Sequence, residues 1–105
     1  MYNQVVIIVT GSIHCHPEHL ADVLSSSLQH VHRSRLEPGC LLHSVHIDAE
    51  NPNRLVFVEH WSDRAALLAH FAVPESRGFA RIAAEHAVEP TVIEVFEASP
   101  VNFRS

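Results

Sequence analysis

The sequence predicts an α+β protein of the ferredoxin-like type, in which a βαββαβ chain forms one four-stranded antiparallel sheet with two helices on one face. Its 105 residues are 47% hydrophobic and 18% charged, which is typical of one globular domain with a single small core. Four short strand-like runs alternate with two segments whose apolar residues recur at helical spacing. We therefore expect one domain over residues 1–105, with residues 98–105 as a C-terminal tail.

The first half of the chain predicts a strand, a helix and a second strand. Residues 5–9 are all β-branched and too few for a helix, so they indicate a strand that continues towards Ile13. Pro17 suits the first turn of a helix that extends to about Arg35. After a Pro-Gly break, residues 40–48 form the second strand. The expected apolar stripe of the helix is Leu20, Val23, Leu24, Leu28 and Val31.

The second half predicts a hairpin and two further helical pieces. A turn at residues 51–53 joins the second strand to a third over residues 55–61. Ser62 or Asp63 then caps a helix, and Pro74 separates it from a second helical piece. The expected inward-facing residues are Leu67, Leu68 and Phe71 in the first piece and Phe79, Ile82, Ala83 and His86 in the second.

Three of the predicted strands, including a last one over residues 92–96, carry apolar residues at both odd and even positions. Because side chains alternate between the two faces of a sheet, both faces then require burial. Two helices can cover only one face. A second copy packed sheet to sheet is the economical cover for the other, so we predict a homodimer.

Charge and cysteine content exclude several classes of partner. Twelve acidic against seven basic side chains give a net charge of -5, which argues against nucleic-acid or anionic-membrane binding. The apolar run at residues 5–9 is too short to span a bilayer, and we expect a cytoplasmic protein with no membrane partner. Cys15 and Cys40 provide neither a disulfide framework nor a four-cysteine zinc site, and we expect both to be buried or half-buried thiols.

Short motifs follow one another in a fixed order between the first predicted strand and Phe79. They are Glu37-Pro38-Gly39-Cys40 before a strand, Asp48 and Asn51-Pro52 at a turn, Val58-Glu59-His60-Trp61, and Ala69-His70-Phe71. Together they resemble the antibiotic biosynthesis monooxygenase (ABM) domain family. The resemblance implies a dimeric α+β barrel of two ferredoxin-like subunits. Characterised members include cofactor-independent monooxygenases that oxidise polycyclic phenols or quinols to quinones, and relatives that degrade haem.

Oxygenation without a metal or flavin needs a substrate whose anion can pass an electron to dioxygen, and a protein that supplies a base and a dry pocket. The resemblance places Trp61, the only tryptophan, in a pocket between sheet and helices, although it can instead anchor the end of its strand. Glu59 projects from the same strand face as Trp61. It can orient a histidine or pair with Arg54 or Arg81.

Three histidines are candidates for handling a proton or binding the substrate, because imidazole titrates near neutral pH. His43 occupies a strand position where many family members carry tyrosine, and it can equally be an exposed strand residue. His70 matches the family's Ala-His pair, or caps a neighbouring carbonyl. His86 shares a helical face with Phe79 and points inward, as a substrate contact or as a core histidine. Candidate pocket walls are Phe57, Phe71 and Phe79.

The other histidines predict no metal centre. His14 and His16 share one strand face, but no His-Glu-x-x-His motif or Cys pair accompanies them. His19, His30 and His32 lie on the flanks of the first helix, where we expect them to be solvated. We expect neither a metal nor a cofactor.

These observations lead to the hypothesis of a homodimeric, cofactor-independent monooxygenase that uses O2 to oxidise a small aromatic phenol or quinol to a quinone. Trp61 would line the pocket, and His43 or His70 would accept or donate the proton. Glu59 would orient that histidine. One alternative is a haem-binding or haem-degrading relative that uses His86, although the asparagine that such relatives carry in the first strand is absent here. Another is a non-catalytic dimeric module that binds a small hydrophobic ligand.

Overall fold

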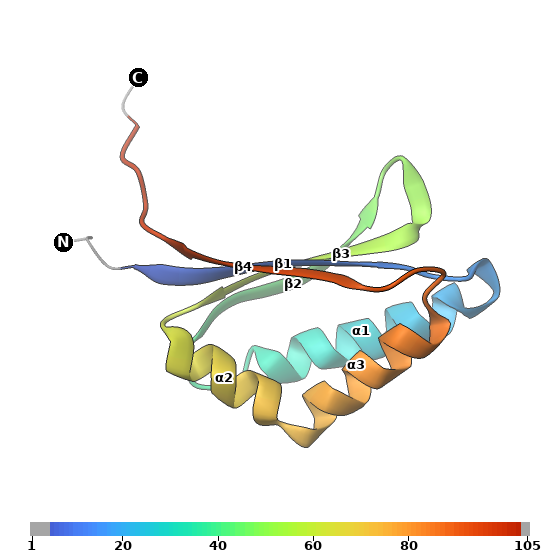
Figure 1. The fold of residues 1–105 in the computed structure, drawn as a ribbon, viewed down its shortest axis with the longest axis horizontal. Helices are drawn as coiled ribbons and strands as arrows, with labels where there is room; N and C mark the ends of the chain where they lie inside the picture. Colours follow the sequence, from blue (N-terminus) through green and yellow to red (C-terminus); the bar gives the residue numbers. More distant parts are fainter. Residues whose placement is uncertain (1–4, 104–105) are drawn as a thin grey trace.

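A four-stranded antiparallel sheet carries all the helices on one face (Figure 1). The computed structural model describes residues 5–103. None of the described helices combines the length and apolar character needed to cross a bilayer. The sheet order is β2-β3-β1-β4, and the fold is the predicted ferredoxin-like βαββαβ arrangement. In chain order the elements are β1 (Val6–His14), η1 (Pro17–His19), α1 (Leu20–Ser34), β2 (Cys40–Asp48), β3 (Asn51–Trp61), α2 (Arg64–Ala72), α3 (Pro74–His86) and β4 (Val92–Ala98).

Local signals set most of these boundaries. The side chain of Asp63 accepts a hydrogen bond from the Ala66 N–H at 2.8 Å and so caps α2. Pro74 begins α3, where its missing N–H costs nothing. Pro17 begins a 3₁₀ turn, not the α-helix itself, and α1 follows from Leu20. Strand β3 begins at Asn51, four residues before the predicted start, because the hairpin closes more tightly than expected.

The inward face of α1 differs from the predicted apolar stripe. Leu28 is exposed, whereas Ser27, His30 and Ser34 are buried beside Val23. The two serines tolerate burial because Ser27 Oγ donates to the Val23 carbonyl at 2.7 Å and Ser34 Oγ donates to the His30 carbonyl at 2.6 Å. The prediction that His30 is solvated is therefore wrong, since helical spacing from Val23 carries it to the sheet side.

Helix α2 also buries a narrower face against the sheet than predicted. Leu67 and His70 are buried, whereas Leu68 is exposed and Phe71 remains 39% exposed. Ile82 in α3 is likewise exposed. A short helix packed on a sheet buries one thin stripe, so Leu67 and His70, three residues apart, take the inward positions.

Two apolar clusters fill the space between sheet and helices. The ring of His30 stacks on Phe79, which packs against the first cluster, and the rings of His43 and His70 contact Trp61 in the second. Polar side chains are thus buried between two apolar groups. The first cluster is Ile13, Cys15, Val23, Val31, Leu55, Phe57 and Ala83, and the second is Ile7, Val9, Trp61 and Leu67.

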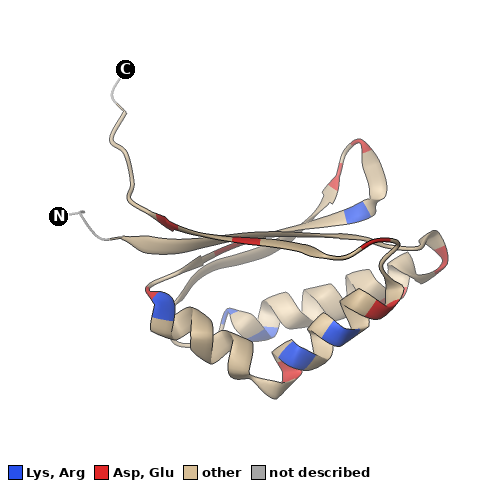
Figure 2. Ribbon diagram, viewed as in Figure 1, with Lys and Arg blue, Asp and Glu red and all other residues tan. Residues whose placement is uncertain are grey.

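The opposite face of the sheet is covered by none of the described elements and carries apolar and polar side chains together. Strand pairing places Leu42, His60, Ile8 and Phe96 side by side across all four strands on this face. Phe96 is 48% exposed. Figure 2 shows charged residues on the helices, the connections and the strands, and strand pairing places Arg54 and Glu94 on this face. The expectation that the helices leave one face of the sheet uncovered is confirmed, and the homodimer stays a prediction.

Gly39 permits the turn that leads from α1 into β2. Its φ is +83°, and a Cβ added there would lie 2.5 Å from the Cβ of Ala66 and 2.7 Å from Oγ of Ser62. We expect Gly39→Ala to lower the free energy of unfolding by about 2–4 kcal/mol, because backbone strain and steric overlap add together. Urea denaturation measures this change.

Gly78 provides the matched control. It lies within α3, and a Cβ added there would have no other atom within 4 Å, so Gly78→Ala should raise the free energy of unfolding by about 0.5–1 kcal/mol. A Gly39→Ala protein as stable as the wild type would contradict the turn geometry.

Candidate functional site

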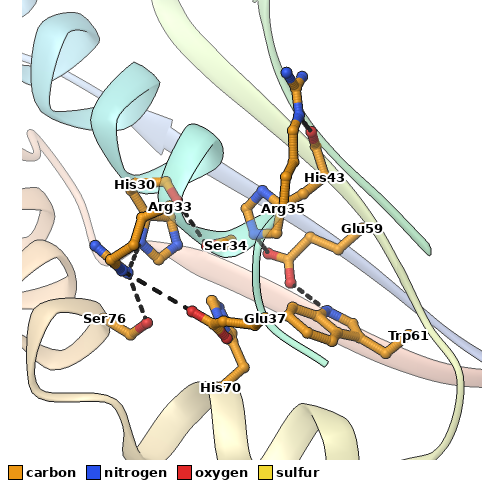
Figure 3. Close-up of polar contacts among 10 residues, drawn as sticks. All are labelled: His30, Arg33, Ser34, Arg35, Glu37, His43, Glu59, Trp61, His70 and Ser76. Carbon is orange, nitrogen blue, oxygen red and sulfur yellow. Dashed lines mark hydrogen bonds and ion pairs between the residues drawn. The ribbon is translucent and has the colours of Figure 1, made fainter. Parts of the chain in front are cut away.

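Three buried imidazoles meet between the sheet and the helices (Figure 3). His30 comes from α1, His43 from β2 and His70 from α2. Their ring centroids are 5.2 Å apart for His30 and His43, 5.2 Å for His30 and His70, and 5.5 Å for His43 and His70. One nitrogen from each ring lies within 4.8 Å of the others. The fold therefore concentrates three titratable rings that are far apart in the sequence.

Strand geometry brings His43 and Glu59 together. The two residues are paired across β2 and β3, and the irregular register between Cys40 and Leu42 sets this pairing on the helix side. The Nε–H of Arg35 donates to the backbone carbonyl of His43 at 2.9 Å and ties β2 to the end of α1. The side chain of His43 is thus directed inward, where the sequence left its direction open.

Glu59 connects His43 with Trp61. Its Oε1 accepts a hydrogen bond from Trp61 Nε1 at 2.8 Å, and its Oε2 lies 3.4 Å from Nε2 of His43. Within the described chain, neither ring nitrogen of His43 has a hydrogen-bond partner. Burial raises the pKa of the Glu59 carboxyl, and the hydrogen bond from Trp61 opposes that rise. Arg54, a possible partner of Glu59, lies near Asp48 instead, with 3.7 Å between Arg54 Nε and Asp48 Oδ2.

A second carboxylate, Glu37, holds His70. Nδ1 of His70 lies 2.8 Å from Oε1 of Glu37, so the ring donates its Nδ1 proton and keeps Nε2 as an acceptor. Arg33 donates to Nδ1 of His30 at 2.8 Å and to Oγ of Ser76 at 2.9 Å, and its Nε lies 3.9 Å from Glu37. These contacts link α1, α2 and α3 around the imidazoles.

Glu37, Arg33 and His30 received no functional role from the sequence. Two signals were available. Glu37 lies four residues after Arg33 and belongs to the Glu-Pro-Gly motif, while His30 follows Val23 by seven residues on one helical face. Neither signal identifies His70 as the residue they surround, because the contact spans 33 residues and depends on how α2 packs.

The environment keeps two of the imidazoles uncharged. Burial lowers the pKa of His30 to about 3, with smaller contributions from His43, His70 and Arg33. Burial likewise lowers the pKa of His43 to about 3, helped by His70, Arg35 and Arg33. Both rings are therefore neutral at pH 7.

A pocket of about 270 Å³ adjoins this cluster, between the helices and strands β1 and β4. His30, Glu59 and His70 form part of its wall, whereas His43 and Trp61 do not reach it. Trp61 is fully buried and contacts His70, with 4.6 Å between ring centroids. The other residues that line the pocket include Phe57, Phe71 and Phe79, with Ser76 and Arg77.

His86 lies away from this pocket. Its ring stacks on that of His19, with centroids 4.2 Å apart, and its backbone carbonyl accepts from the His16 N–H at 3.0 Å. His14 lies 3.8 Å from Glu89, apart from His16, which is exposed. The structure therefore does not bring these histidines together as ligands of one ion.

The fold and the pocket define a ferredoxin-like α+β protein with a small pocket between its sheet and its helices. Residues 6–82 match the family model described as antibiotic biosynthesis monooxygenase. The chain belongs to this family.

Similar proteins support the assignment. A crystal structure of an antibiotic biosynthesis monooxygenase is 29% identical, covers 90% of this chain and 99% of its own, and has a TM-score of 0.83. Rv0793 from Mycobacterium tuberculosis has the same fold, with 20% identity, coverage of 95% and 99%, and a TM-score of 0.83. The uncharacterised protein sll1783 of Synechocystis is 31% identical over 91 residues, which is 87% of this chain. The match spans 62% of the length of that relative.

Acid should destabilise the protein through His30 and His43. Their pKa of about 3 in the folded chain lies below the ordinary value of about 6.5, so the unfolded chain binds more protons between these values. The free energy of unfolding should therefore fall as pH drops below about 6.5, with a slope approaching about 2.7 kcal/mol per pH unit for two protons. Urea denaturation, repeated across this pH range in a buffer that contains a chelator to exclude trace metal ions, measures how the free energy of unfolding changes with pH.

Single substitutions test which histidines cause this pH dependence of the free energy of unfolding. His30→Gln and His43→Gln should each remove up to one proton from the slope, whereas His32→Gln, at an exposed position of α1, should leave it unchanged. A stability that does not vary with pH in this range would contradict the buried neutral imidazoles.

Proposed function

We propose that the protein is a monooxygenase that oxidises a small aromatic phenol or quinol to a quinone with O2. The observation that carries this proposal is the pocket with phenylalanine walls and the His70–Glu37 pair at one end. Its volume of about 270 Å³ is at the small end of ligand sites, which suits a compound of one or two rings. Membership of the ABM family supports the same class of reaction.

His70 is the proposed base. It reaches the pocket wall, whereas the side chain of His43 is fully enclosed. Glu37 accepts the Nδ1 proton of His70, so the other ring nitrogen is available to take the phenolic proton. The aromatic walls keep water away from the resulting anion. We assign His43 and Trp61 to positioning, because both rings contact His70 without reaching the pocket, and Glu59 to holding them, since it lies beside His43 and accepts from Trp61.

The proposed reaction needs no external reductant. In the simplest case, one molecule of phenol and one of O2 give one molecule of benzoquinone and one of water. One oxygen atom forms a new bond to ring carbon, and the other leaves as water with two hydrogens from the substrate. The substrate loses four electrons and O2 gains four, so the phenolate itself supplies the electron that starts the reaction.

Oxygen uptake with a panel of hydroquinones and polyphenols tests this proposal. His70→Gln should lower kcat about 100-fold or more, and Glu37→Gln should lower it less, because it only disturbs the orientation of the base. The control is His32→Gln, which should keep wild-type activity since the residue is exposed on α1. Uptake that survives a chelator supports a reaction without a metal.

Other outcomes point to the alternatives. Saturable binding of hydroquinones with no uptake indicates a module that binds a small hydrophobic ligand. A haem titration, read by absorbance, tests the haem-binding alternative, which requires dependence on His86. Uptake that is unchanged in His70→Gln would reject His70 as the base.

We also propose that the protein is a homodimer whose subunits meet through the uncovered sheet face. This face presents Leu42, Val58, Ile8 and Phe96, and no described element covers it. Burying these apolar side chains against a second copy covers the open faces of both sheets at once.

Light scattering at micromolar concentration measures the assembly. The wild type should have twice the mass of the 11.7 kDa chain, and Phe96→Glu should shift it to the monomer, because a carboxylate would be buried at the interface. Leu68→Glu is the control, since Leu68 is 66% exposed on the helix side and should leave the dimer intact. A monomeric wild type would contradict the proposal.

A further inference from the structure

We infer that His30, His43 and His70 form a binding site for one divalent first-row transition-metal ion, with Glu59 beside it. The inference does not rest on the proposed function. Nothing in the sequence pattern indicates this site, because its three ligands come from two helices and a strand.

The spacing of the rings fits a common metal centre. An imidazole nitrogen binds such an ion at about 2.0–2.1 Å, and the ring centroid lies about 1.1–1.2 Å further out. Tetrahedral angles then place the centroids of two ligating imidazoles about 5.2 Å apart. The three observed centroid distances are 5.2, 5.2 and 5.5 Å. The nitrogens themselves lie within 4.8 Å of one another, so binding requires the rings to rotate until their nitrogens are about 3.3 Å apart.

His43 supplies the strongest individual signal. Its side chain has no exposed surface, and neither ring nitrogen has a hydrogen-bond partner in the described part of the chain. Most buried polar atoms in proteins are paired, so a buried nitrogen of this kind is available for coordination. The Oε2 atom of Glu59 lies 3.4 Å from its Nε2, which is about the separation of two ligands on one tetrahedral ion.

The surroundings resemble those that orient metal ligands. Glu37 accepts from Nδ1 of His70, and a carboxylate on the outer nitrogen commonly fixes a ligating histidine with its other nitrogen towards the metal. Arg33 donates to Nδ1 of His30, so coordination requires this hydrogen bond to shift. Arg33 keeps Ser76 at 2.9 Å and Glu37 at 3.9 Å as partners when it does.

The ligand set selects the class of metal. Three imidazoles suit Zn²⁺, Co²⁺, Ni²⁺, Cu²⁺ or Fe²⁺, whereas Mg²⁺ and Ca²⁺ prefer oxygen ligands. His30, His70 and Glu59 line the pocket wall, so an ion can enter from the pocket. A bound ion would occupy the free nitrogen of His70, and this residue could then serve as the proposed base only in the metal-free protein.

Titration of the chelator-treated full-length protein with Co²⁺ and Zn²⁺ tests the site. We expect one ion per chain, the visible absorption of tetrahedral Co²⁺, and a higher melting temperature with either ion. His30→Gln, His43→Gln and His70→Gln should each weaken binding at least tenfold. The matched controls are His32→Gln and His16→Gln, since both histidines are exposed away from the uncovered sheet face and should leave binding unchanged.

Three results would overturn the inference. They are no stoichiometric binding by the wild type, binding that is insensitive to all three ligand substitutions, and binding weakened equally by the control substitutions. Circular dichroism shows whether His43→Gln folds. If it does not, metal binding by His30→Gln and His70→Gln, together with the effect of the ion on the melting temperature of the wild type, decides whether the site exists.

Parallel oxygen uptake on metal-free protein separates this inference from the proposed function. Uptake by a protein that binds no metal rejects the site and keeps the monooxygenase. Stoichiometric binding without uptake supports the site and rejects the monooxygenase.

Discussion

The structure depends on burying three imidazoles, with their carboxylate partners, between a sheet and the helices that cover it. Imidazole rings can be buried at neutral pH because they lose their charge, and desolvation lowers the pKa of His30 and His43 accordingly. The charged groups Arg33 and Glu37 lie next to the imidazoles, each hydrogen-bonded to one of them. Arg33 and Glu37 bridge α1 to α2 and α3, and they enclose the cluster on the helix side.

This arrangement explains where a pocket can form. The polar cluster ends at a pocket wall that phenylalanines continue. The result is a small apolar space with His70 and Glu59 at its edge and Trp61 behind them. Such a site can hold a flat aromatic molecule against a proton acceptor, or it can direct ring nitrogens at an ion.

Sequence patterns predicted the order of the elements well, because strand and helix signals are local. The limits of β2 and the Asp63 cap of α2 follow from short-range hydrogen bonding and turn chemistry. Burial was predicted less well. Leu28 and Leu68 are exposed, while His30 and Ser27 are buried, because hydropathy ignores the hydrogen bonds that allow a polar side chain to be buried.

The sequence by itself determined the ferredoxin-like topology, the family, and a sheet with one face left uncovered by helices. These features depend on spacing along the chain and on the alternation of strand side chains. Only the tertiary structure decided that His43 faces the helices, that His30 joins it, and that Glu37 holds His70. The reason is physical: those contacts depend on strand register and on the rotation of two helices about their axes, and a change of one residue in either would separate the groups.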